Sequence, residues 1–379
     1  MNENPLRLLN HLGQSVWLDY LGREIIDSGK LKKLIDEDSL SGVTSNPTIF
    51  QKAISGSTDY DRKLKALIDK DISDAKELFL GLAIDDISDA ADILWPVYES
   101  TGGKDGFVSI EVSPDLAFDT GETIEEARHL FSTIGKKNIL VKVPATEPGL
   151  PAIEQLTSEG ININVTLLFS VNRYAKVAEA YIKGLEKRVS EGKPIHEIRS
   201  VASFFVSRVD TLTDKLIEDK INVSSSADEK ETLRGLCGKA AVANAKYAYK
   251  KYEEIFLGDR FSSVKEKGAN IQRLLWGSTG TKNPDYSDVK YIEDIIAPNT
   301  VNTLPEKTIN AFRDHGKAVV TIYNMMNGAE ATLAELKSHG IDIEEVADQL
   351  EKEGVKSFSD SFFALLKEIE EKRKSFFVR

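Results

Sequence analysis

The sequence predicts an α/β protein in which eight parallel strands close into a (β/α)8 barrel. Eight short apolar runs with strand character follow one another, at 16–20, 42–46, 107–112, 139–144, 161–169, 201–206, 274–278 and 301–304. Longer segments with helical periodicity and good helix formers separate these runs. Strands that alternate with helices in this way form parallel sheets, and eight such units are typical of a single TIM barrel.

We expect residues 1–379 to form one barrel domain with added helices. Two connections, at about 51–106 and 210–271, are long and helical in pattern almost throughout. A short polar loop at 224–228 interrupts the second connection. No linker rich in proline, glycine or serine flanks either of them, so we interpret both as helical insertions around the barrel rather than as separate domains.

Three helices can be predicted in more detail. One is expected over 123–134, opening with a capping box of Thr123 and Glu126. A second is expected over 171–190, where apolar residues recur at helical spacing. After residue 304 the chain stays helical in pattern, and a last helix is expected to open at Ser359, with one face formed by Phe362, Phe363, Leu366 and Ile369. That helix could cross the barrel mouth or lie on the outer ring, which is the more frequent arrangement.

The composition argues against several classes of partner. Lysine and arginine number 49 against 61 aspartate and glutamate, a net charge of −12, so no general affinity for nucleic acid or an anionic membrane is expected. The first residues lack the basic and then apolar pattern of a signal peptide, and no apolar stretch is long enough to cross a bilayer. Cys237 is the single cysteine, which excludes an intrachain disulfide, and we interpret it as a packed helical residue. A soluble, cytoplasmic protein is expected.

The histidines do not suggest a metal site. His11, His129, His196, His315 and His339 are scattered, without ligand-like spacing and outside the strand ends. The sequence also contains no glycine-rich loop of the nucleotide-binding type. We therefore expect neither a metal nor an organic cofactor. The sequence leaves the oligomeric state open, and a homodimer is one of the alternatives.

Lys142 is the most informative single residue, because it stands inside the apolar run at 139–144. An ammonium among hydrocarbon groups is costly unless it is paired or neutralised. Burial favours the neutral amine, and a neutral amine is the nucleophile that forms Schiff bases. The alternative interpretation is a lysine at a strand end that extends to solvent.

Seven of the eight strand runs carry polar groups at or just beyond their carboxyl ends, where barrel enzymes place their chemistry. These groups, in chain order, are Asp19, Asn46, Glu111, Lys142, Asn164 with Thr166, Ser203 with Arg208, and Ser278 with Lys282. Each is ambiguous alone. Asn46 precedes a proline and could be a turn residue, and threonine, as at Thr166, is common in strands. Lys282 by itself would be interpreted as a solvent-exposed charge in a loop. Together they favour one shared site.

This set has a chemical logic. A neutral Lys142 could attack a ketone, with Glu111 and Thr166 moving protons through a water. Carbon–carbon cleavage beside the imine needs a base for the C4 hydroxyl, and Asp19 suits that role. Asn46 and Asn164 could hold hydroxyl groups. Arg208 and Lys282 could hold a terminal phosphate.

The residues around these positions stand in recognisable motifs. The segments 42–50 (GVTSNPTIF) and 139–150 (ILVKVPATEPGL) resemble the two transaldolase signatures, and 164–170 (NVTLLFS) and 203–208 (SFFVSR) resemble the fifth and sixth strands of that family. The resemblance runs in register from about Val16 to the C-terminus. The length of the chain is more similar to that of the long bacterial subgroup of the family than to that of the short forms.

The resemblance implies a single (β/α)8 barrel with the Schiff-base lysine, Lys142, on strand four. It implies transfer of a dihydroxyacetone unit from fructose 6-phosphate or sedoheptulose 7-phosphate to an aldose phosphate in the pentose phosphate pathway, without metal or cofactor. Carried over by position, Asp19 matches the acid/base aspartate, and Glu111 and Thr166 match the pair that activates water. Asn46 and Asn164 match the residues that contact the imine and the hydroxyl groups. Ser203 matches the residue that touches the dihydroxyacetone end, and Arg208 matches the residue that binds phosphate.

One segment departs from the family pattern. The best-known transaldolases have a Ser-x-Arg phosphate clamp in strand seven, whereas this chain has Ser278 and, four residues later, Lys282. We assign the clamp to these two residues. Two alternative functions remain. One is a fructose 6-phosphate aldolase, but the members of that group are shorter and have tyrosine where this chain has Phe205. The other is a non-catalytic sugar-phosphate-binding barrel, which would be expected to lack one or more of Lys142, Asp19 and Glu111.

Overall fold

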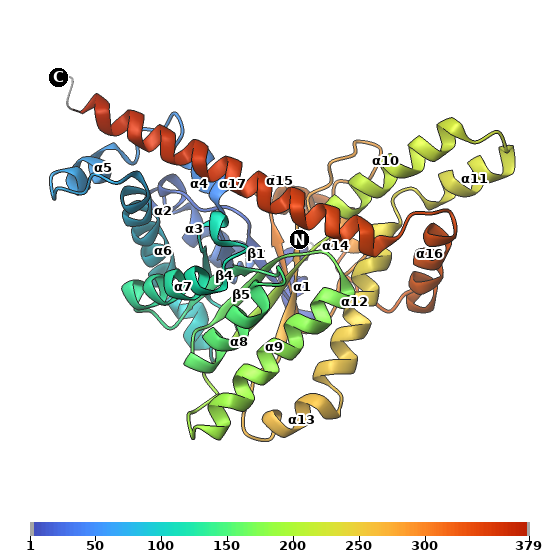
Figure 1. Ribbon diagram of the computed structural model, residues 1–379, viewed down its shortest axis with the longest axis horizontal. Helices are drawn as coiled ribbons and strands as arrows, with labels where there is room; N and C mark the ends of the chain where they lie inside the picture. The colour runs from blue at the N-terminus through green and yellow to red at the C-terminus, as the bar shows by residue number, and fades with distance from the viewer. Residues whose placement is uncertain (1–3, 377–379) are drawn as a thin grey trace.

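The eight strands close into a barrel in which each strand is parallel to its neighbours, as predicted (Figure 1). The structure is a computed structural model and describes residues 4–376, apart from the side chain of Asn327. The strands, in their order around the barrel, are β1 (Gln14–Leu18), β2 (Gly42–Thr44), β3 (Phe107–Glu111), β4 (Ile139–Pro144), β5 (Ile163–Leu168), β6 (Ser200–Phe205), β7 (Gln272–Gly277) and β8 (Thr300–Leu304). Each lies within or beside a predicted run.

Helices surround this barrel. In chain order they are α1 (Pro5–His11), α2 (Arg23–Asp27), α3 (Lys30–Asp38), α4 (Pro47–Ile54), α5 (Asp61–Ile68), α6 (Ala75–Ser100), η1 (Pro114–Leu116), α7 (Thr120–Ile134), α8 (Gly149–Glu159), α9 (Val171–Ser190), α10 (Ser207–Val223), α11 (Ala227–Leu236), α12 (Ala240–Phe256), α13 (Asp259–Lys265), α14 (Lys290–Glu293), α15 (Glu306–His315), α16 (Met326–Ser338) and α17 (Ile343–Ser375). Helices α5 and α6 lie in the connection between β2 and β3, and α10 to α13 lie between β6 and β7.

Apolar strands fit this architecture because a parallel barrel is covered on both faces. Every strand residue is buried. One apolar layer lies between the strands and the helices, and a smaller cluster, which includes Trp17, Leu140 and Leu275, fills the barrel interior. Gly42 makes room for that cluster, since a Cβ there would lie 2.4 Å from ring atoms of Trp17.

Helix α9 spans the predicted residues, but the predicted start of α7 is wrong. The helix begins at Thr120, and the Asp119 carboxylate caps it by accepting a hydrogen bond of 2.9 Å from the backbone N–H of Glu122. Thr123 lies inside the helix and donates to the Leu116 carbonyl. The two possible caps, Asp119 and Thr123, are four residues apart, and the structure uses the earlier one.

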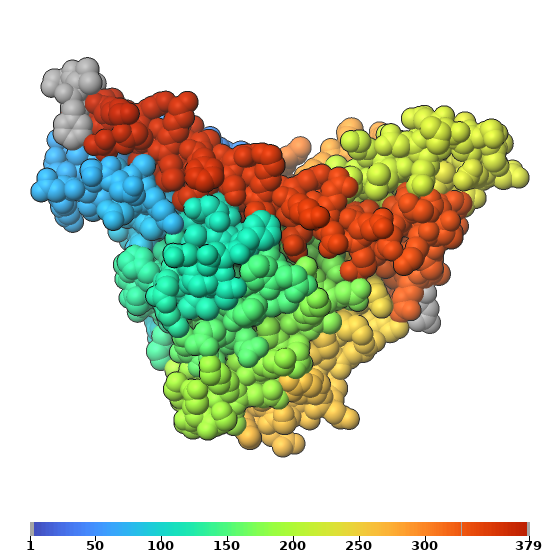
Figure 2. Space-filling view, in the orientation of Figure 1, coloured from blue at the N-terminus to red at the C-terminus, as the bar shows by residue number. Residues whose placement is uncertain are grey.

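The C-terminal helix differs from the prediction in its start and its face, and its position is the first of the two that the sequence left open. It begins at Ile343, capped by Asp342, and Phe363 is 55% exposed while Phe362 and Ile369 are buried. The helix packs against α4, α6, α10 and η1 and therefore crosses the barrel mouth, not the outer ring (Figure 1, red). In the space-filling view it forms a continuous ridge between α5 and α16 (Figure 2).

Candidate active site

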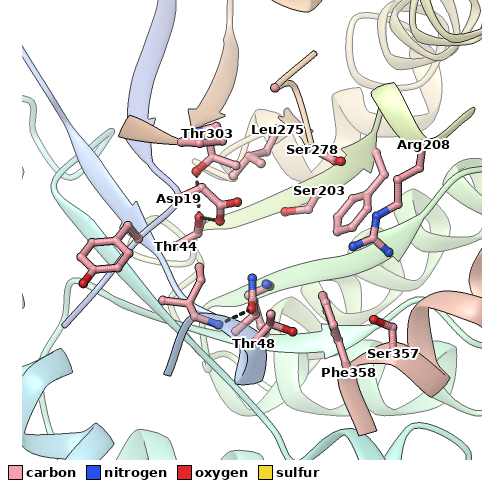
Figure 3. Close-up of a pocket in the computed structure, with 18 of the residues that line it drawn as sticks. Asp19, Thr44, Thr48, Ser203, Arg208, Leu275, Ser278, Thr303, Ser357 and Phe358 are labelled. Carbon is pink, nitrogen blue, oxygen red and sulfur yellow. Dashed lines mark hydrogen bonds between the residues drawn. The ribbon is translucent and has the colours of Figure 1, made fainter. Parts of the chain in front are cut away.

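The barrel mouth under α17 contains a cavity of about 380 Å³. It is lined by the carboxyl ends of several strands, by the loops that follow them, and by one turn of α17 (Figure 3). Seven predicted site residues line it: Asp19, Asn46, Lys142, Ser203, Arg208, Ser278 and Lys282. Residues that were far apart in the sequence therefore meet at one end of the barrel.

Lys142 is buried, with 5% of its side chain exposed, and its ammonium is paired. The Nζ atom lies 3.0 Å from Oε2 of Glu111 and donates a hydrogen bond of 3.1 Å to the Ser45 carbonyl. The parallel register sets Glu111 of β3 opposite Lys142 of β4, so strand pairing alone brings the two charges together. Burial raises the pKa of the Glu111 carboxyl, and the nearby ammonium opposes that rise.

Asp19 follows β1 and lies on the cavity wall. Its Oδ1 atom accepts a hydrogen bond of 2.8 Å from Thr44, whose hydroxyl lies 2.7 Å from that of Thr303 (Figure 3). Burial raises the pKa of Asp19, although Lys142 and the Thr44 hydroxyl act in the opposite direction. A carboxyl with this balance is suited to accept and release a proton.

The prediction missed Thr44 and Thr303, although a signal for them existed. Thr44 lies two residues before Asn46 and Thr303 lies in the eighth strand, to which no polar group had been assigned. Since side chains alternate in a strand, residues two apart share a face, so parity could have pointed to Thr44. Threonine is common in strands, which hides such a position.

Asn164, Ser203 and Ser109 form a buried hydrogen-bonded chain below the cavity. Ser203 donates to Oδ1 of Asn164 at 2.6 Å, and Asn164 donates to the Ser109 hydroxyl at 3.0 Å. Asn164 pairs in register with Lys142 on β4 but does not line the cavity itself. This chain orients the Ser203 hydroxyl, which does line it.

Thr166 and Glu111 also lie outside the cavity lining. Thr166 is fully buried on β5, and among the described residues its hydroxyl has no hydrogen-bond partner. Oε1 of Glu111 is also buried and has no hydrogen-bond partner among the described residues. A bound water or a catalytic role is one explanation for such atoms, and no direct hydrogen bond joins the two side chains.

A basic end of the cavity is formed by Arg208 and Lys282. The Arg208 guanidinium lies 5.4 Å from the ring centre of Phe205 and 5.9 Å from that of Phe358, between two aromatic faces. Burial lowers the pKa of Arg208. Lys282 is open to solvent at the cavity, yet surrounding protein atoms, and then the charge of Arg208, lower its pKa to about 8.

Ser278 and Asn46 are held in defined backbone geometry. Ser278 has a left-handed backbone (φ 53°), uncommon for a residue other than glycine, and its hydroxyl lies 3.2 Å from that of Ser207. Asn46 caps α4 by accepting a hydrogen bond of 2.9 Å from the Ile49 N–H. The turn role considered for Asn46 is therefore real, and its side chain still lines the cavity.

Ser357 and Phe358 of α17 complete the lining, and the prediction missed both. Phe358 is 4% exposed, and its ring centre lies 6.0 Å from the Nζ of Lys142. No local signal could place these residues here, because only the packing of α17 across the mouth does so. The predicted start at Ser359 also left them outside the helix.

Other predicted features lie away from this cavity. Cys237 lies at the C-terminal cap of α11, partly buried, and not within a helix, and burial raises the pKa of its thiol. Among residues 4–376, no group of three or more histidine, cysteine or acidic side chains is arranged to hold a metal ion. Each helix in that range is too short or too polar to serve as a membrane span.

Comparison with known proteins agrees with the geometry. The model of the family described as transaldolase/fructose-6-phosphate aldolase matches residues 16–369. A protein named transaldolase from Trichodesmium erythraeum is 46% identical, with 99% of both chains covered. One named transaldolase 2 from Streptomyces coelicolor is 48% identical, with 98% of both covered, and one named transaldolase from Thiobacillus denitrificans is 46% identical over 97% of this chain. The chain therefore belongs to the transaldolase/fructose-6-phosphate aldolase family.

Proposed function

We propose that this protein is a transaldolase that carries a dihydroxyacetone unit on Lys142 between two sugar phosphates. The observation that carries the proposal is the buried Lys142 amine beside Glu111, in a cavity whose far end is basic. Relatives of nearly equal length that are named transaldolase support the same activity. The substrates are a ketose phosphate, either fructose 6-phosphate or sedoheptulose 7-phosphate, and an aldose phosphate acceptor, as in the pentose phosphate pathway of the cytoplasm.

Schiff-base formation requires proton transfers around Lys142. The ammonium first passes a proton to Glu111, 3.0 Å away, and the neutral amine then attacks the C2 carbonyl of the ketose. A C–N bond forms, and the carbinolamine hydroxyl leaves as water after taking up a proton. Glu111 supplies that proton, either directly or through a water held near Thr166. The raised pKa of Glu111 makes the carboxyl a competent proton donor.

Cleavage and transfer then use Asp19. Its carboxylate takes the proton of the C4 hydroxyl, the C3–C4 bond breaks, and its electrons pass into the imine to give an enamine. The aldose phosphate product leaves. The acceptor aldehyde then binds, the enamine carbon attacks it, and Asp19 returns the proton to the new hydroxyl. Hydrolysis of the final imine releases the new ketose phosphate and Lys142.

The remaining cavity residues bind substrate. Arg208, Lys282 and Ser278 are gathered where a terminal phosphate can lie, with two cations and one hydroxyl. Ser203, oriented by Asn164, contacts the dihydroxyacetone end, and Asn46 contacts the imine or a hydroxyl. No step in this scheme requires a metal or an organic cofactor.

Reductive trapping tests the covalent step. Borohydride added with fructose 6-phosphate reduces an imine to a stable secondary amine, so a dihydroxyacetone-sized mass should appear on the peptide that contains Lys142. The Lys142→Arg variant is the control and should stay unlabelled. Label on Lys282, or on any lysine other than Lys142, contradicts the assignment.

An activity measurement separates transferase from aldolase. Glyceraldehyde 3-phosphate release from fructose 6-phosphate should be sustained only when erythrose 4-phosphate is present as acceptor. Equal release without the acceptor identifies a fructose 6-phosphate aldolase, the other activity that the family name includes. The absence of release under both conditions favours a binding protein.

A further inference from the structure

Helix α17 places an aromatic ring directly over the reacting amine. Phe358 is 4% exposed, and its ring centre lies 6.0 Å from the Nζ of Lys142 and 5.9 Å from the Cζ of Arg208. The ring therefore stands between the proposed imine and the proposed phosphate site, on the side of the cavity formed by α17 (Figure 3). A second aromatic ring of the cavity, that of Phe205 at the end of β6, lies 5.4 Å from the Cζ of Arg208.

The close approach of α17 depends on Gly354, one turn before Phe358. A Cβ at Gly354 would lie 2.8 Å from Cδ2 of Leu167 and 3.8 Å from Nη1 of Arg208. Glycine is unfavourable inside a helix relative to alanine, so its presence here is consistent with a packing requirement. The missing side chain lets the helix descend far enough for Phe358 to reach the cavity.

Polar contacts on both sides hold the helix over the mouth. At its N-terminal end, Ser170 donates to Glu344 at 2.6 Å. Toward its C-terminal end, Thr48 donates to Ser361 at 2.8 Å. These contacts join α17 to the loop after β5 and to α4, so the aromatic ring is anchored to the barrel mouth.

The chemistry gives this ring a purpose. After the first aldose phosphate leaves, the three-carbon unit stays on Lys142 as an enamine until an acceptor binds. In competition with transfer, protonation of the enamine carbon restores the imine, water adds to the imine carbon, and the carbinolamine loses the lysine amine. That sequence releases free dihydroxyacetone and consumes one water. A transferase must slow it, and an apolar cover over the amine lowers the local concentration of water.

We propose that Phe358 favours transfer over hydrolysis by shielding the lysine-bound three-carbon unit from bulk water. This inference rests on the proposed function, because it presupposes the Schiff base on Lys142. Phe358 acts as a positioning residue and a barrier: it takes no part in proton transfer. Its second contact, with Arg208, keeps that guanidinium turned toward the phosphate.

The test measures how the intermediate partitions. Release of free dihydroxyacetone from fructose 6-phosphate without acceptor is divided by the rate of transfer to saturating erythrose 4-phosphate. In Phe358→Ala this ratio should rise about tenfold or more, which corresponds to about 1.4 kcal/mol of lost discrimination. Phe358→Leu keeps an apolar cover and should leave the ratio within about twofold of the wild-type value, a difference below about 0.5 kcal/mol.

Phe363→Ala is the matched control. Phe363 lies on the same helix and is 55% exposed, so its removal changes α17 without opening the cavity, and the ratio should stay at the wild-type value. If Phe358→Ala does not fold, Phe358→Gln, which fills much of the same space with a polar group that attracts water, is held to the same expectation. An unchanged ratio in a folded variant whose Lys142 is still labelled by borohydride overturns this inference alone. Loss of labelling in the wild type overturns the proposed function itself.

Discussion

The central feature of the site is two carboxyls beside a single buried amine. Burial raises the pKa of both Asp19 and Glu111, and the charge of Asp19 raises that of Glu111 further. The Lys142 ammonium opposes this rise at both groups, but the effect of burial is larger. Carboxyls with raised pKa values are suited to the proton transfers proposed for this site.

Glu111→Gln should slow imine formation more than substrate binding. The amide keeps the shape of the side chain but cannot carry a proton, so the rate of borohydride labelling should fall by about 10²- to 10⁴-fold, the usual contribution of a general acid or base. Pre-steady-state trapping with fructose 6-phosphate measures that rate. Glu126→Gln, outside the cavity, serves as control, and an unchanged rate in Glu111→Gln would remove Glu111 from this step.

Lys282 should give the reaction a dependence on pH. Its pKa is lowered to about 8, so in the free enzyme the cation is present below about pH 8 and is lost as the pH rises through that value. In the proposed function this cation binds the substrate phosphate, so kcat/KM should fall above pH 8 while kcat, which reports the occupied site, changes less. Lys282→Arg keeps its charge and should abolish this limb of the profile.

Lys282→Ala tests the same residue without changing the pH. The variant should raise KM for phosphorylated substrates more than it lowers kcat, because the lost contact is present in both the ground state and the transition state. Measurements with fructose 6-phosphate and erythrose 4-phosphate at pH 7 decide this point. An unchanged KM would place the phosphate elsewhere.

Helix α10 is tied to the chain around it by Asp210, which lies two residues after Arg208. Its carboxyl accepts hydrogen bonds from the Ala241 N–H at 2.7 Å, at the start of α12, and from the Tyr291 hydroxyl at 2.8 Å, in α14. Burial raises its pKa from the usual 3.8 to about 6. This one side chain therefore couples α10, which carries Arg208, to α12 and α14.

Asp210 should leave a signature in the pH dependence of stability. Because its pKa is higher in the folded protein than in the unfolded chain, its contribution to the free energy of unfolding is largest below about pH 4 and declines as the pH rises to about 6. Asp210→Asn does not titrate, so the wild-type value minus the variant value should decline over that range. Urea unfolding at several pH values measures the difference, and a constant difference would contradict the pKa shift.

The molecule separates stability from chemistry at the two ends of its barrel. The amino-terminal end is closed by Asp105, which accepts hydrogen bonds from Ser15 at 2.7 Å and Trp17 at 3.1 Å and pairs with Arg273 at 2.9 Å. Asp105 and Arg273 are both 7% exposed. The carboxyl-terminal end holds the proposed catalytic groups instead, which is the usual division in barrels of this type.

Asp105→Ala should therefore lower stability without removing activity. Loss of the carboxylate leaves the Arg273 cation buried without its charged partner, and the free energy of unfolding should fall by about 3–5 kcal/mol. At a temperature where the variant is still folded, kcat should stay close to the wild-type value.

Lys142→Met should show the reverse pattern. Its activity should be abolished, and its free energy of unfolding should change less than that of Asp105→Ala, because Glu111 can take up a proton. Urea unfolding and the transfer assay together check both variants.

Much of the fold and the site was predictable because the relevant physics is local. Buried parallel strands need apolar side chains on both faces, so the eight runs mark the barrel directly. A charged residue inside such a run stands out, which is why Lys142 and Glu111 were identified. Thr44 and Thr303 were missed because threonine is also common in strands that have no functional role.

The C-terminal helix marks the limit of this reasoning. Its helical character was visible in the sequence, but its predicted start was wrong, and the sequence left its place open between the barrel mouth and the outer ring. The sequence by itself determines the order and the chemistry of the residues at the strand ends. The placement of Phe358 over Lys142 depends instead on contacts between segments that are far apart in sequence. Helical periodicity describes one face of one segment, and where that face packs is set by the free energy of the whole assembled molecule.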